Sequence, residues 1–240
     1  MRNIDVEAER QFENGKVEGS ISRAAQDKFY EATRLDESNF QDFFCKKLDS
    51  KNVLEIGCTY GRDAKIYSTF CKTYVGIDLS DKGIEAAKNL GIKNCSFVCG
   101  DAHALPFSES RFDVVIVSSL LHHLDIPLAL KEIRRVLKQD GILIFREPLG
   151  INPIFKLYRY ITPNARTDDE MPFRYADIAL IRDMFKVQHE HFFGFFVLAS
   201  AILKPKVMGR AFFKIDRILA RTPMKYLFWQ IGGVYANKKK

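Results

Sequence analysis

Short apolar runs rich in β-branched residues recur along the first two thirds of the chain, and stretches with helical spacing separate them. The runs cover residues 53–57, 74–79, 95–101, 112–118 and 141–147. Between them, apolar positions three and four residues apart predict helices around residues 62–70, 81–91 and 126–141. We expect Gly141 to end the last of these helices as a C-cap. Strands that alternate with helices predict right-handed βαβ units and a parallel sheet.

The predicted strands show almost no alternation between apolar and polar positions. Strands of this kind are typical of a parallel sheet that helices cover on both faces. Before the first strand, residues 20–49 have helical spacing. Later segments predict a helix at about residues 175–185, a strand near 187–195, a helix around 207–220 and a last strand within 226–236. We therefore predict an α/β, Rossmann-like, doubly wound fold whose mostly parallel sheet has about seven strands, with the last strand antiparallel.

The composition is that of a folded chain with an uneven charge. Apolar residues make up 47% of the 240 residues, and the net charge is +7, with the excess of Lys and Arg in the last third. The five cysteines are scattered and form no C-x-x-C pair, so we expect neither a zinc ribbon nor a disulfide framework, and a reducing, cytoplasmic location. We also expect no secretory leader and no membrane-spanning segment, because the longest apolar run, residues 192–203, is too short.

Acidic residues stand at four of the five strand ends in the first two thirds of the chain: Glu55, Asp78, Asp101 and Glu147. In an open parallel sheet, ligands bind beyond the carboxyl ends of the strands. Carboxylates gathered there would suit a ligand rich in hydroxyl and amino groups and would repel a pyrophosphate.

The loop after the first strand, in VLEIGCTYG, differs from a dinucleotide-binding loop. Its glycines are Gly57 and Gly61, and Thr59 stands where the middle glycine of G-x-G-x-x-G would be. Glu55, two residues before the first glycine, would repel phosphate but could accept an ammonium group. Asp78 lies about twenty residues further on, where a ribose-binding carboxylate is expected. The spacing of the glycines and the presence of Glu55 disfavour an NAD-dependent oxidoreductase.

Taken in order, these segments resemble the class I S-adenosylmethionine-dependent methyltransferases, in the broad group that includes ubiquinone and menaquinone biosynthesis enzymes. VLEIGCTYG resembles the first motif of that family, GIDLS the second and GDAHALPF the third. FDVVIVSSLLHHL and RVLKQDGILIFREP resemble its later motifs. The resemblance covers about residues 50–148, and the ordered set of motifs is far more specific than the glycine loop alone.

The resemblance implies S-adenosylmethionine as the cofactor and assigns a part of it to each motif. Gly57, Cys58, Gly61 and Ser118 would lie along its methionine moiety, with Glu55 near the amino group. Asp78 would bind the ribose hydroxyls and Leu79 would flank the adenine. Asp101 would accept from the adenine amino group, and Ala102 would donate a backbone N–H. The alternative is structural: each carboxylate alone could serve as a cap or turn residue.

We expect one methyltransferase domain over residues 1–240, in four parts: an N-terminal helical segment (1–50), a cofactor-binding half (51–148), a lid-like insertion (149–173) and a C-terminal part (174–240). The C-terminal part contains an amphipathic insertion at about residues 197–224, where apolar and aromatic residues interleave with Lys and Arg. Such a composition suits contact with an anionic membrane or an amphiphilic acceptor, although most segments of this kind are part of the core or of a dimer face.

His122 and His123 follow the fourth strand, and Glu147 ends the fifth, so these three are the candidate catalytic residues. Histidine is the commonest general base near neutral pH, but one of the two could instead cap the next helix or pack under the lid. In the predicted lid, Tyr158, Arg159 and Arg166 are candidates for contact with the substrate; the alternative is a salt-bridged structural loop.

We expect methyl transfer to a small, apolar or amphiphilic acceptor, such as a quinone-like molecule, a lipid or a glycolipid intermediate. An RNA or protein methyltransferase and a non-catalytic cofactor-binding protein stay open as alternatives. Nucleic acid is disfavoured because the chain has no recognisable aromatic-basic RNA module, and SSLL replaces an amino-methylating N-P-P-Y after the fourth strand. We expect no metal, a monomer or homodimer, and peripheral membrane contact at most.

Overall fold

The computed structural model describes residues 6–17, 33, 37–150, 152, 156, 160, 173–195 and 206–238. Its strands are β1 (Asn52–Ile56), β2 (Thr73–Asp78), β3 (Cys95–Cys99), β4 (Phe112–Ser118), β5 (Leu137–Pro148), β6 (Phe185–Phe193) and β7 (Gln230–Asn237). Its α-helices are α1 (Val6–Val17), α3 (Ala64–Tyr67), α4 (Asp81–Lys88), α5 (Ile126–Val136), α7 (Tyr175–Met184) and α9 (Lys206–Leu219). Two 3₁₀ helices, η1 (Leu121–His123) and η3 (Pro223–Leu227), precede α5 and β7.

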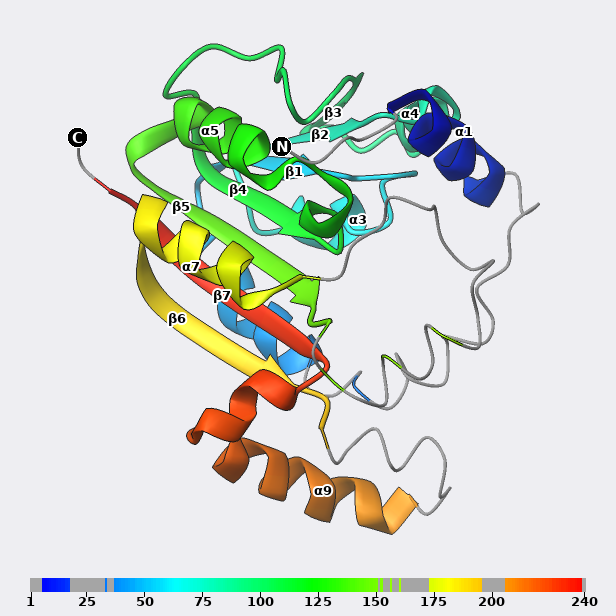
Figure 1. Cartoon of the computed structure of the whole chain (residues 1–240). Coiled ribbons are helices and arrows are strands. Elements are labelled where there is room, and N and C mark those ends of the chain that lie inside the picture. Colours follow the sequence, from blue (N-terminus) through cyan, green and yellow to red (C-terminus); the bar gives the residue numbers. More distant parts are fainter. Residues whose placement is uncertain are drawn as a thin grey trace.

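The strands form one sheet in the order β3-β2-β1-β4-β5-β7-β6 (Figure 1). Neighbours from β3 to β5 pair in parallel, and β7 runs antiparallel between β5 and β6. The predicted Rossmann-like fold is therefore confirmed, including the antiparallel last strand. The order in which strands are added switches sides between β1 and β4. Because the strands from β3 to β5 are parallel, the loops after β1, β2, β3 and β4 lie at the same end of the sheet.

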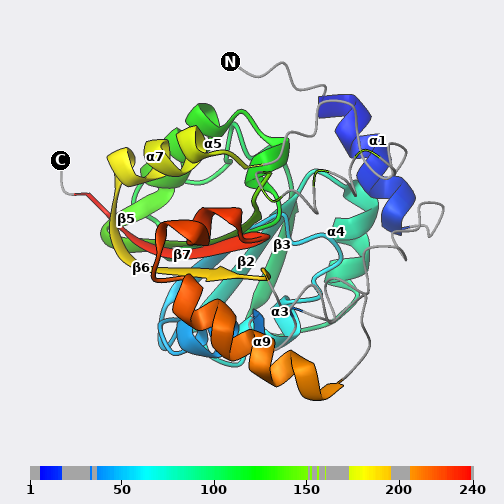
Figure 2. The same ribbon diagram turned by 60° about the horizontal axis from the view of Figure 1, so that its bottom comes forward.

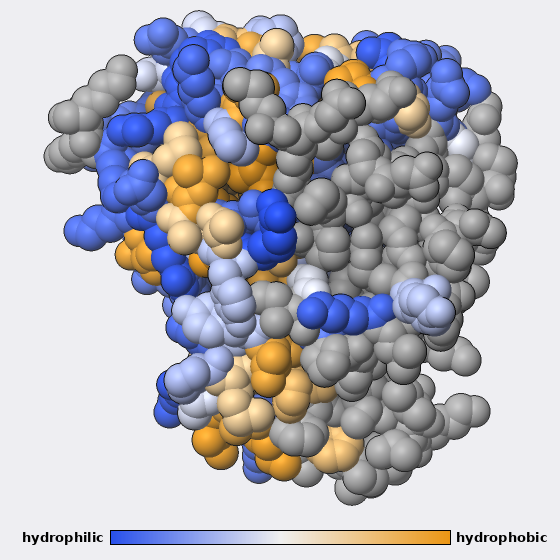
Figure 3. Space-filling view, in the orientation of Figure 1, coloured by the Kyte–Doolittle hydropathy of each residue, from blue (hydrophilic) through white to orange (hydrophobic). Residues whose placement is uncertain are grey.

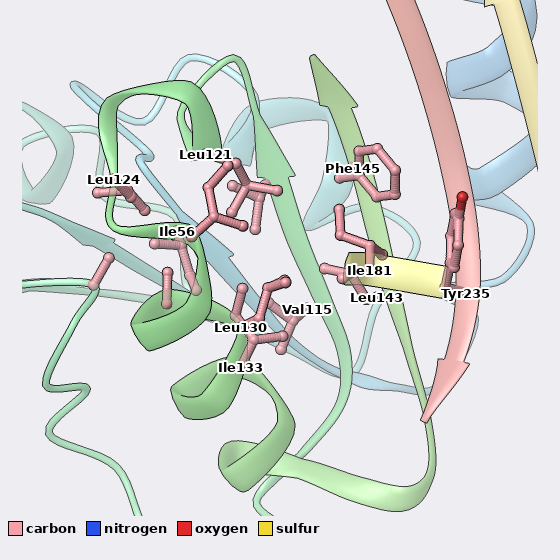
Figure 4. Close-up of a cluster of buried hydrophobic side chains, with 14 of the residues drawn as sticks. Ile56, Val115, Leu121, Leu124, Leu130, Ile133, Leu143, Phe145, Ile181 and Tyr235 are labelled. Carbon is pink, nitrogen blue, oxygen red and sulfur yellow. The ribbon is translucent and has the colours of Figure 1, made fainter. Parts of the chain in front are cut away.

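Two apolar clusters cover the faces of the sheet. On one face, α5 and α7 pack over β4 and β5, with Leu130, Ile133 and Ile181 against Val115 and Leu143 (Figure 4). On the other face, helical residues 37–45 pack with α3 and α4 through a second cluster: Phe40, Phe44, Leu48, Val53, Tyr67, Tyr74, Ile84, Ala87 and Val234. Helices on both faces explain why the strands carry apolar residues without alternation.

The predicted C-cap at Gly141 is wrong. Helix α5 ends at Val136, and Leu137 already has extended backbone and pairs with Phe112 of β4. The side chain of Lys138, on β5, also pairs with the neighbouring strand β4: its Nζ lies 2.9 Å from Oδ1 of Asp113. The polar residues before Gly141 continue the helical pattern in the sequence, but strand pairing determines their conformation.

Two helices lie outside the central layers. α1 packs beside α4, and α9 lies beyond the ends of β6 and β7 (Figures 1 and 2). The predicted helix over residues 20–49 is described only in part, as helical residues 37–45 and residue 33. Over the described residues, no helix is long and apolar enough to cross a membrane.

Candidate active site

A cavity of about 810 Å³ opens at the carboxyl ends of β1 to β5. This volume lies in the upper part of the range for small-molecule sites, about 300–1,000 Å³. Predicted cofactor-binding residues from four strand ends line it: Glu55, Gly57, Cys58, Asp78, Leu79, Asp101, Ala102 and Ser118. The structure thus brings together residues spread over 64 positions of the sequence, as the order of the strands requires.

The glycine loop needs its two glycines for different contacts. Gly57 has a φ of +82°, and a Cβ there would lie 2.9 Å from Cδ2 of Leu120. Gly61, at a φ of +74°, does not line the cavity; a Cβ there would lie 2.9 Å from Cδ1 of Leu90 in the turn after α4. Gly57 thus shapes the cavity, whereas Gly61 lets the loop pack on α4.

Thr59 occupies the place of the missing glycine with a φ of 49°. Its backbone N–H donates to Oδ2 of Asp78 at 2.7 Å, and the N–H of Ser80 donates to Oδ1 at 2.9 Å. The Asp78 carboxylate therefore ties the loop after β1 to the start of α4. Each carboxylate oxygen can accept more than one bond, so Asp78 can also bind hydroxyl groups from the cavity.

Glu55 is 3% exposed and lines the cavity. Tyr74, on the neighbouring strand β2, donates its hydroxyl to Oε2 of Glu55. Burial is the main cause that raises the pKa of Glu55 to about 8, and the nearby charge of Asp63 adds to it. A buried carboxyl group with a raised pKa fits an ammonium ligand, because a cation at this point would replace the lost solvation of the carboxylate.

Asp101 and His103 form a second bridge at the edge of the cavity. Oδ1 of Asp101 accepts the backbone N–H of His103 at 2.8 Å and lies 2.7 Å from Nδ1 of its ring. Nε2 of His103 accepts the backbone N–H of Asp125 at 3.0 Å, so the ring proton must lie on Nδ1. His103 therefore links the loop after β3 to the start of α5. We did not predict this role, although the residue lies inside the GDAHALPF motif.

The cavity is strongly acidic in a chain whose net charge is positive. Among the residues that the structure describes, its lining contains no lysine and two guanidinium groups, those of Arg62 and Arg146. Seven carboxylate side chains line it: Glu9, Glu13, Glu37, Glu55, Asp63, Asp78 and Asp101. Such a lining fits a cationic ligand with amino and hydroxyl groups, which agrees with the sequence prediction, and disfavours a pyrophosphate.

Other walls of the cavity come from segments that are distant in the sequence. α1 contributes Val6, Glu9 and Glu13, and β5 contributes Ile144, Phe145 and Arg146. The helical segment 37–45 adds Phe40 and Phe44, both buried. We call this part of the cavity the acceptor end and the part around Glu55, Asp78 and Asp101 the cofactor end. The sequence contains no motif that predicts the acceptor end.

The two candidate histidines occupy different places. His123 is 6% exposed and lines the cavity, and its Nδ1 lies 3.2 Å from Oε1 of Glu9. His122 does not line the cavity; its Nδ1 lies 2.7 Å from Oε2 of Glu147. Oε1 of Glu147 also accepts the backbone N–H groups of Leu120 and Leu121, at 3.0 and 2.8 Å. Glu147 is fully buried and positions η1 from β5 without lining the cavity.

The predicted lid residues Tyr158, Arg159 and Arg166 lie outside the described residues. Within the described part, residues 149 and 173 form an isolated bridge, and Asn152 Nδ2 donates to the carbonyl of Leu227 at 2.7 Å. The described residues contain no group of three His, Cys, Asp or Glu side chains arranged to hold a metal ion.

Comparison with known families identifies the segment that carries the cofactor end. Residues 54–145 match a family model described as a methyltransferase domain. These residues form a methyltransferase domain. The resemblance to S-adenosylmethionine-dependent methyltransferases is therefore confirmed, as is S-adenosylmethionine as the cofactor of the family.

Curated relatives resemble part of this chain over part of their own length. An uncharacterized methyltransferase, YcgJ of Bacillus subtilis, is 35% identical over 94 residues, which are 37% of each chain. A fatty-acid O-methyltransferase of Mycolicibacterium smegmatis is 34% identical over 42% of this chain and 38% of its own. A ubiquinone biosynthesis O-methyltransferase of Coxiella burnetii is 31% identical over 47% and 49%. The chain thus matches less than half the length of these relatives.

Solved structures resemble the fold over a larger share of this chain than the curated relatives do. The crystal structure of YcgJ from Bacillus subtilis has a TM-score of 0.59 at 17% identity and covers 83% of this chain and 97% of its own. The N-methyltransferase NodS of Bradyrhizobium japonicum, in complex with S-adenosylhomocysteine, has a TM-score of 0.57 at 15% identity and covers 84% and 86%. At these identities the likeness shows only that this chain and the two solved structures share a fold.

Proposed function

We propose that the chain transfers a methyl group from S-adenosylmethionine to a hydroxyl group of a small, apolar or amphiphilic acceptor. The observation that carries the proposal is the composition of one continuous cavity. Its cofactor end gathers carboxylates from the ends of β1, β2 and β3, and its acceptor end joins aromatic side chains to a buried imidazole.

At the cofactor end, Glu55 would accept the cofactor amino group and Asp78 the ribose hydroxyls. Asp101 would accept the adenine amino group through the oxygen that His103 does not use. When bound, the cofactor supplies an activated methyl group, so the protein need only orient the acceptor and remove its proton. The acidic lining favours the positively charged cofactor over its neutral product.

At the acceptor end, the side chains of Phe40, Phe44 and Phe145 would hold an apolar body, and His123 would accept the hydroxyl proton. Imidazole is the usual general base near neutral pH. The relatives named for a fatty acid, for phthiotriol and phenolphthiotriol dimycocerosates, and for ubiquinone biosynthesis support an acceptor of this class. An RNA acceptor would need a positively charged approach, which the acidic cavity does not offer.

The test uses the full chain and two measurements. Isothermal titration with S-adenosylhomocysteine should show one site, and labelled S-adenosylmethionine should transfer its methyl group into the organic-solvent fraction of a lipid extract. Label in the aqueous macromolecular fraction alone would contradict the acceptor class. No binding of S-adenosylhomocysteine to folded protein would contradict the cofactor assignment itself.

Helix α9 supports the amphiphilic part of the proposal. Its buried Asp216 accepts the backbone N–H of Phe195 at 3.1 Å, whereas Ile215 and Ile218 on the outer side are 41% and 65% exposed. Lys214, Arg217 and Arg221 are also exposed. Figure 3 shows hydrophobic residues at the lower end of the molecule, where Figure 1 places α9. Aliphatic side chains ringed by cations fit an anionic membrane surface.

Flotation with phosphatidylcholine vesicles, with and without phosphatidylglycerol, tests this contact. The chain should float with the anionic vesicles at low salt, and the double variant Ile215→Ser, Ile218→Ser should stay in the protein fraction. Equal recovery of the variant and the unchanged protein with the vesicles would contradict a role for this face.

A further inference from the structure

The N-terminal helix α1 is held against the loop that follows β2. Asn14 Nδ2 donates to Oδ1 of Asp81 at 3.0 Å, and the Ser80 hydroxyl donates to Oδ1 of Asn14 at 2.5 Å. Ser80 is the N-cap of α4 and follows Asp78 by two residues. The position of α1 is therefore tied to the segment that carries the predicted ribose-binding carboxylate.

This placement brings Glu9 into the acceptor end. Glu9 is 8% exposed, lines the cavity, and has its Oε1 3.2 Å from Nδ1 of His123. A carboxylate buried to this degree is costly unless a positive or hydrogen-bonding group accompanies it. The two atoms lie within ion-pair distance without the alignment of a hydrogen bond, so the carboxylate acts on the ring through its charge. That charge favours the ring proton on the nearer nitrogen, Nδ1, and leaves the lone pair of Nε2 available to take another proton.

The neighbouring histidine provides an internal contrast. His122 and His123 have ring centroids 4.2 Å apart, and each has a glutamate from a distant segment beside its Nδ1. Glu147 holds His122 away from the cavity and also bonds the backbone of η1. Of these two pairs, the one from α1 and η1 has both members in the lining of the cavity, whereas neither His122 nor Glu147 lines it among the described residues. The pairing thus separates a structural histidine from one placed to act on an acceptor.

We propose that Glu9 is a positioning residue for His123, an inference that rests on the proposed methyl transfer to a hydroxyl. The acceptor oxygen forms the new O–C bond while the S–C bond of the cofactor breaks and leaves its electron pair on sulfur. The hydroxyl proton passes to Nε2 of His123, and the carboxylate of Glu9 stabilises the resulting imidazolium. Helix α1 therefore completes the catalytic arrangement and does more than cover the cavity.

Ring-nitrogen NMR of the full chain tests the pairing without any acceptor. The chain has five histidines, and His123→Asn identifies the signals of His123. In Glu9→Ala we expect the ring-nitrogen chemical shifts of His123 to change from those of a ring protonated on Nδ1 toward a mixture of the two tautomers. The chemical shifts of His122 should stay unchanged. Glu7→Gln is the matched control, because Glu7 lies exposed on the same helix. His123 signals that are identical in Glu9→Ala and the unchanged chain would overturn the proposal.

Rates of label transfer from S-adenosylmethionine into the lipid fraction give the second measurement. Removing a positioned acid–base partner lowers kcat, and we expect about a tenfold to hundredfold loss in Glu9→Ala with the KM for S-adenosylmethionine unchanged. Glu9→Gln preserves the size and an acceptor oxygen, so it should recover part of the rate and keeps the test decisive if Glu9→Ala does not fold. A kcat within about twofold of the unchanged chain in both variants would overturn the proposal.

The two measurements separate this inference from the proposed function. Absence of S-adenosylhomocysteine binding, or of any lipid labelling by the unchanged chain, contradicts the proposed function. The NMR result still decides whether Glu9 fixes the ring of His123. Normal labelling with an unmoved His123 signal contradicts the role of Glu9 alone.

Discussion

The two ends of the cavity are built in different ways. At the cofactor end, carboxylates stand at consecutive strand ends, and Asp78 and Asp101 accept backbone N–H groups of the loops beside them. At the acceptor end, the charged groups pair across long sequence separations, as in Glu9 with His123 and Arg146 with Glu37. One end is specified locally by the βαβ units, whereas the other exists only when distant segments have packed together.

This difference suggests how one fold can keep a cofactor and change its acceptor. The carboxylates of the cofactor end also stabilise the loops, so replacing them disturbs the fold as well as binding. The residues of the acceptor end lie on α1, on helical residues 37–45 and on β5, outside the loops after β1 and β2. The segment that matches the family model, residues 54–145, contains the carboxylates of the cofactor end and lacks both α1 and helical residues 37–45.

Glu147 fixes η1, which carries His123 into the cavity, so its removal should have the largest effect. In Glu147→Ala, two buried backbone N–H groups and the ring of His122 lose their acceptor, and the free energy of unfolding should fall by about 3 kcal/mol. Urea denaturation measures this fall. Glu147→Gln should lose less because its amide oxygen can still accept, and Glu109→Ala, on an exposed turn, should stay within about 0.5 kcal/mol. Equal free energies of unfolding for Glu147→Ala and Glu109→Ala would show that the bonds of Glu147 to η1 do not stabilise the fold.

Asp78→Ala should abolish most of the affinity at the cofactor end. The variant loses the ribose acceptor and releases the N–H groups of Thr59 and Ser80, so S-adenosylhomocysteine should bind about a hundredfold more weakly, near 3 kcal/mol. Isothermal titration measures the change. Asp183→Ala removes an exposed carboxylate from α7, away from the cavity, and should bind normally. Affinity unchanged in Asp78→Ala would contradict the placement of the ribose.

The comparison also explains what the sequence could and could not predict. The order of the strands and the residues at their ends follow from local patterns, so Glu55, Asp78 and Asp101 could be found without a structure. Glu9 could not, because its partner His123 is 114 positions away and α1 has no motif. Tyr74 was missed for another reason: it lies on the strand beside Glu55, and only the register of β1 with β2 brings the two side chains together. The helix end at Val136 depended on strand pairing in the same way.

Glu55 should make cofactor binding depend on pH. Its pKa of about 8 means that it is protonated at neutral pH, and the ammonium group of the ligand favours the carboxylate, so binding releases a proton. The affinity for S-adenosylhomocysteine should therefore rise as the pH rises toward 8, by up to about tenfold per unit, and level off above it. Glu55→Gln removes the titrating group and should flatten the profile. Titration in buffers of different ionisation enthalpy measures the released proton, and equal heats in all buffers would contradict the assignment.

A substitution at the acceptor end should have the smallest effect of all on the affinity for the cofactor. Glu37 and Arg146 pair within the acceptor end, and neither bonds the loops that carry Asp78 and Asp101. Glu37→Gln should therefore leave the dissociation constant of S-adenosylhomocysteine within about twofold, since sites without shared partners act independently. The same variant should alter the rate of label transfer into lipid, because it releases the guanidinium of Arg146 toward the acceptor. A tenfold loss of cofactor affinity would instead show that the two ends act as one site.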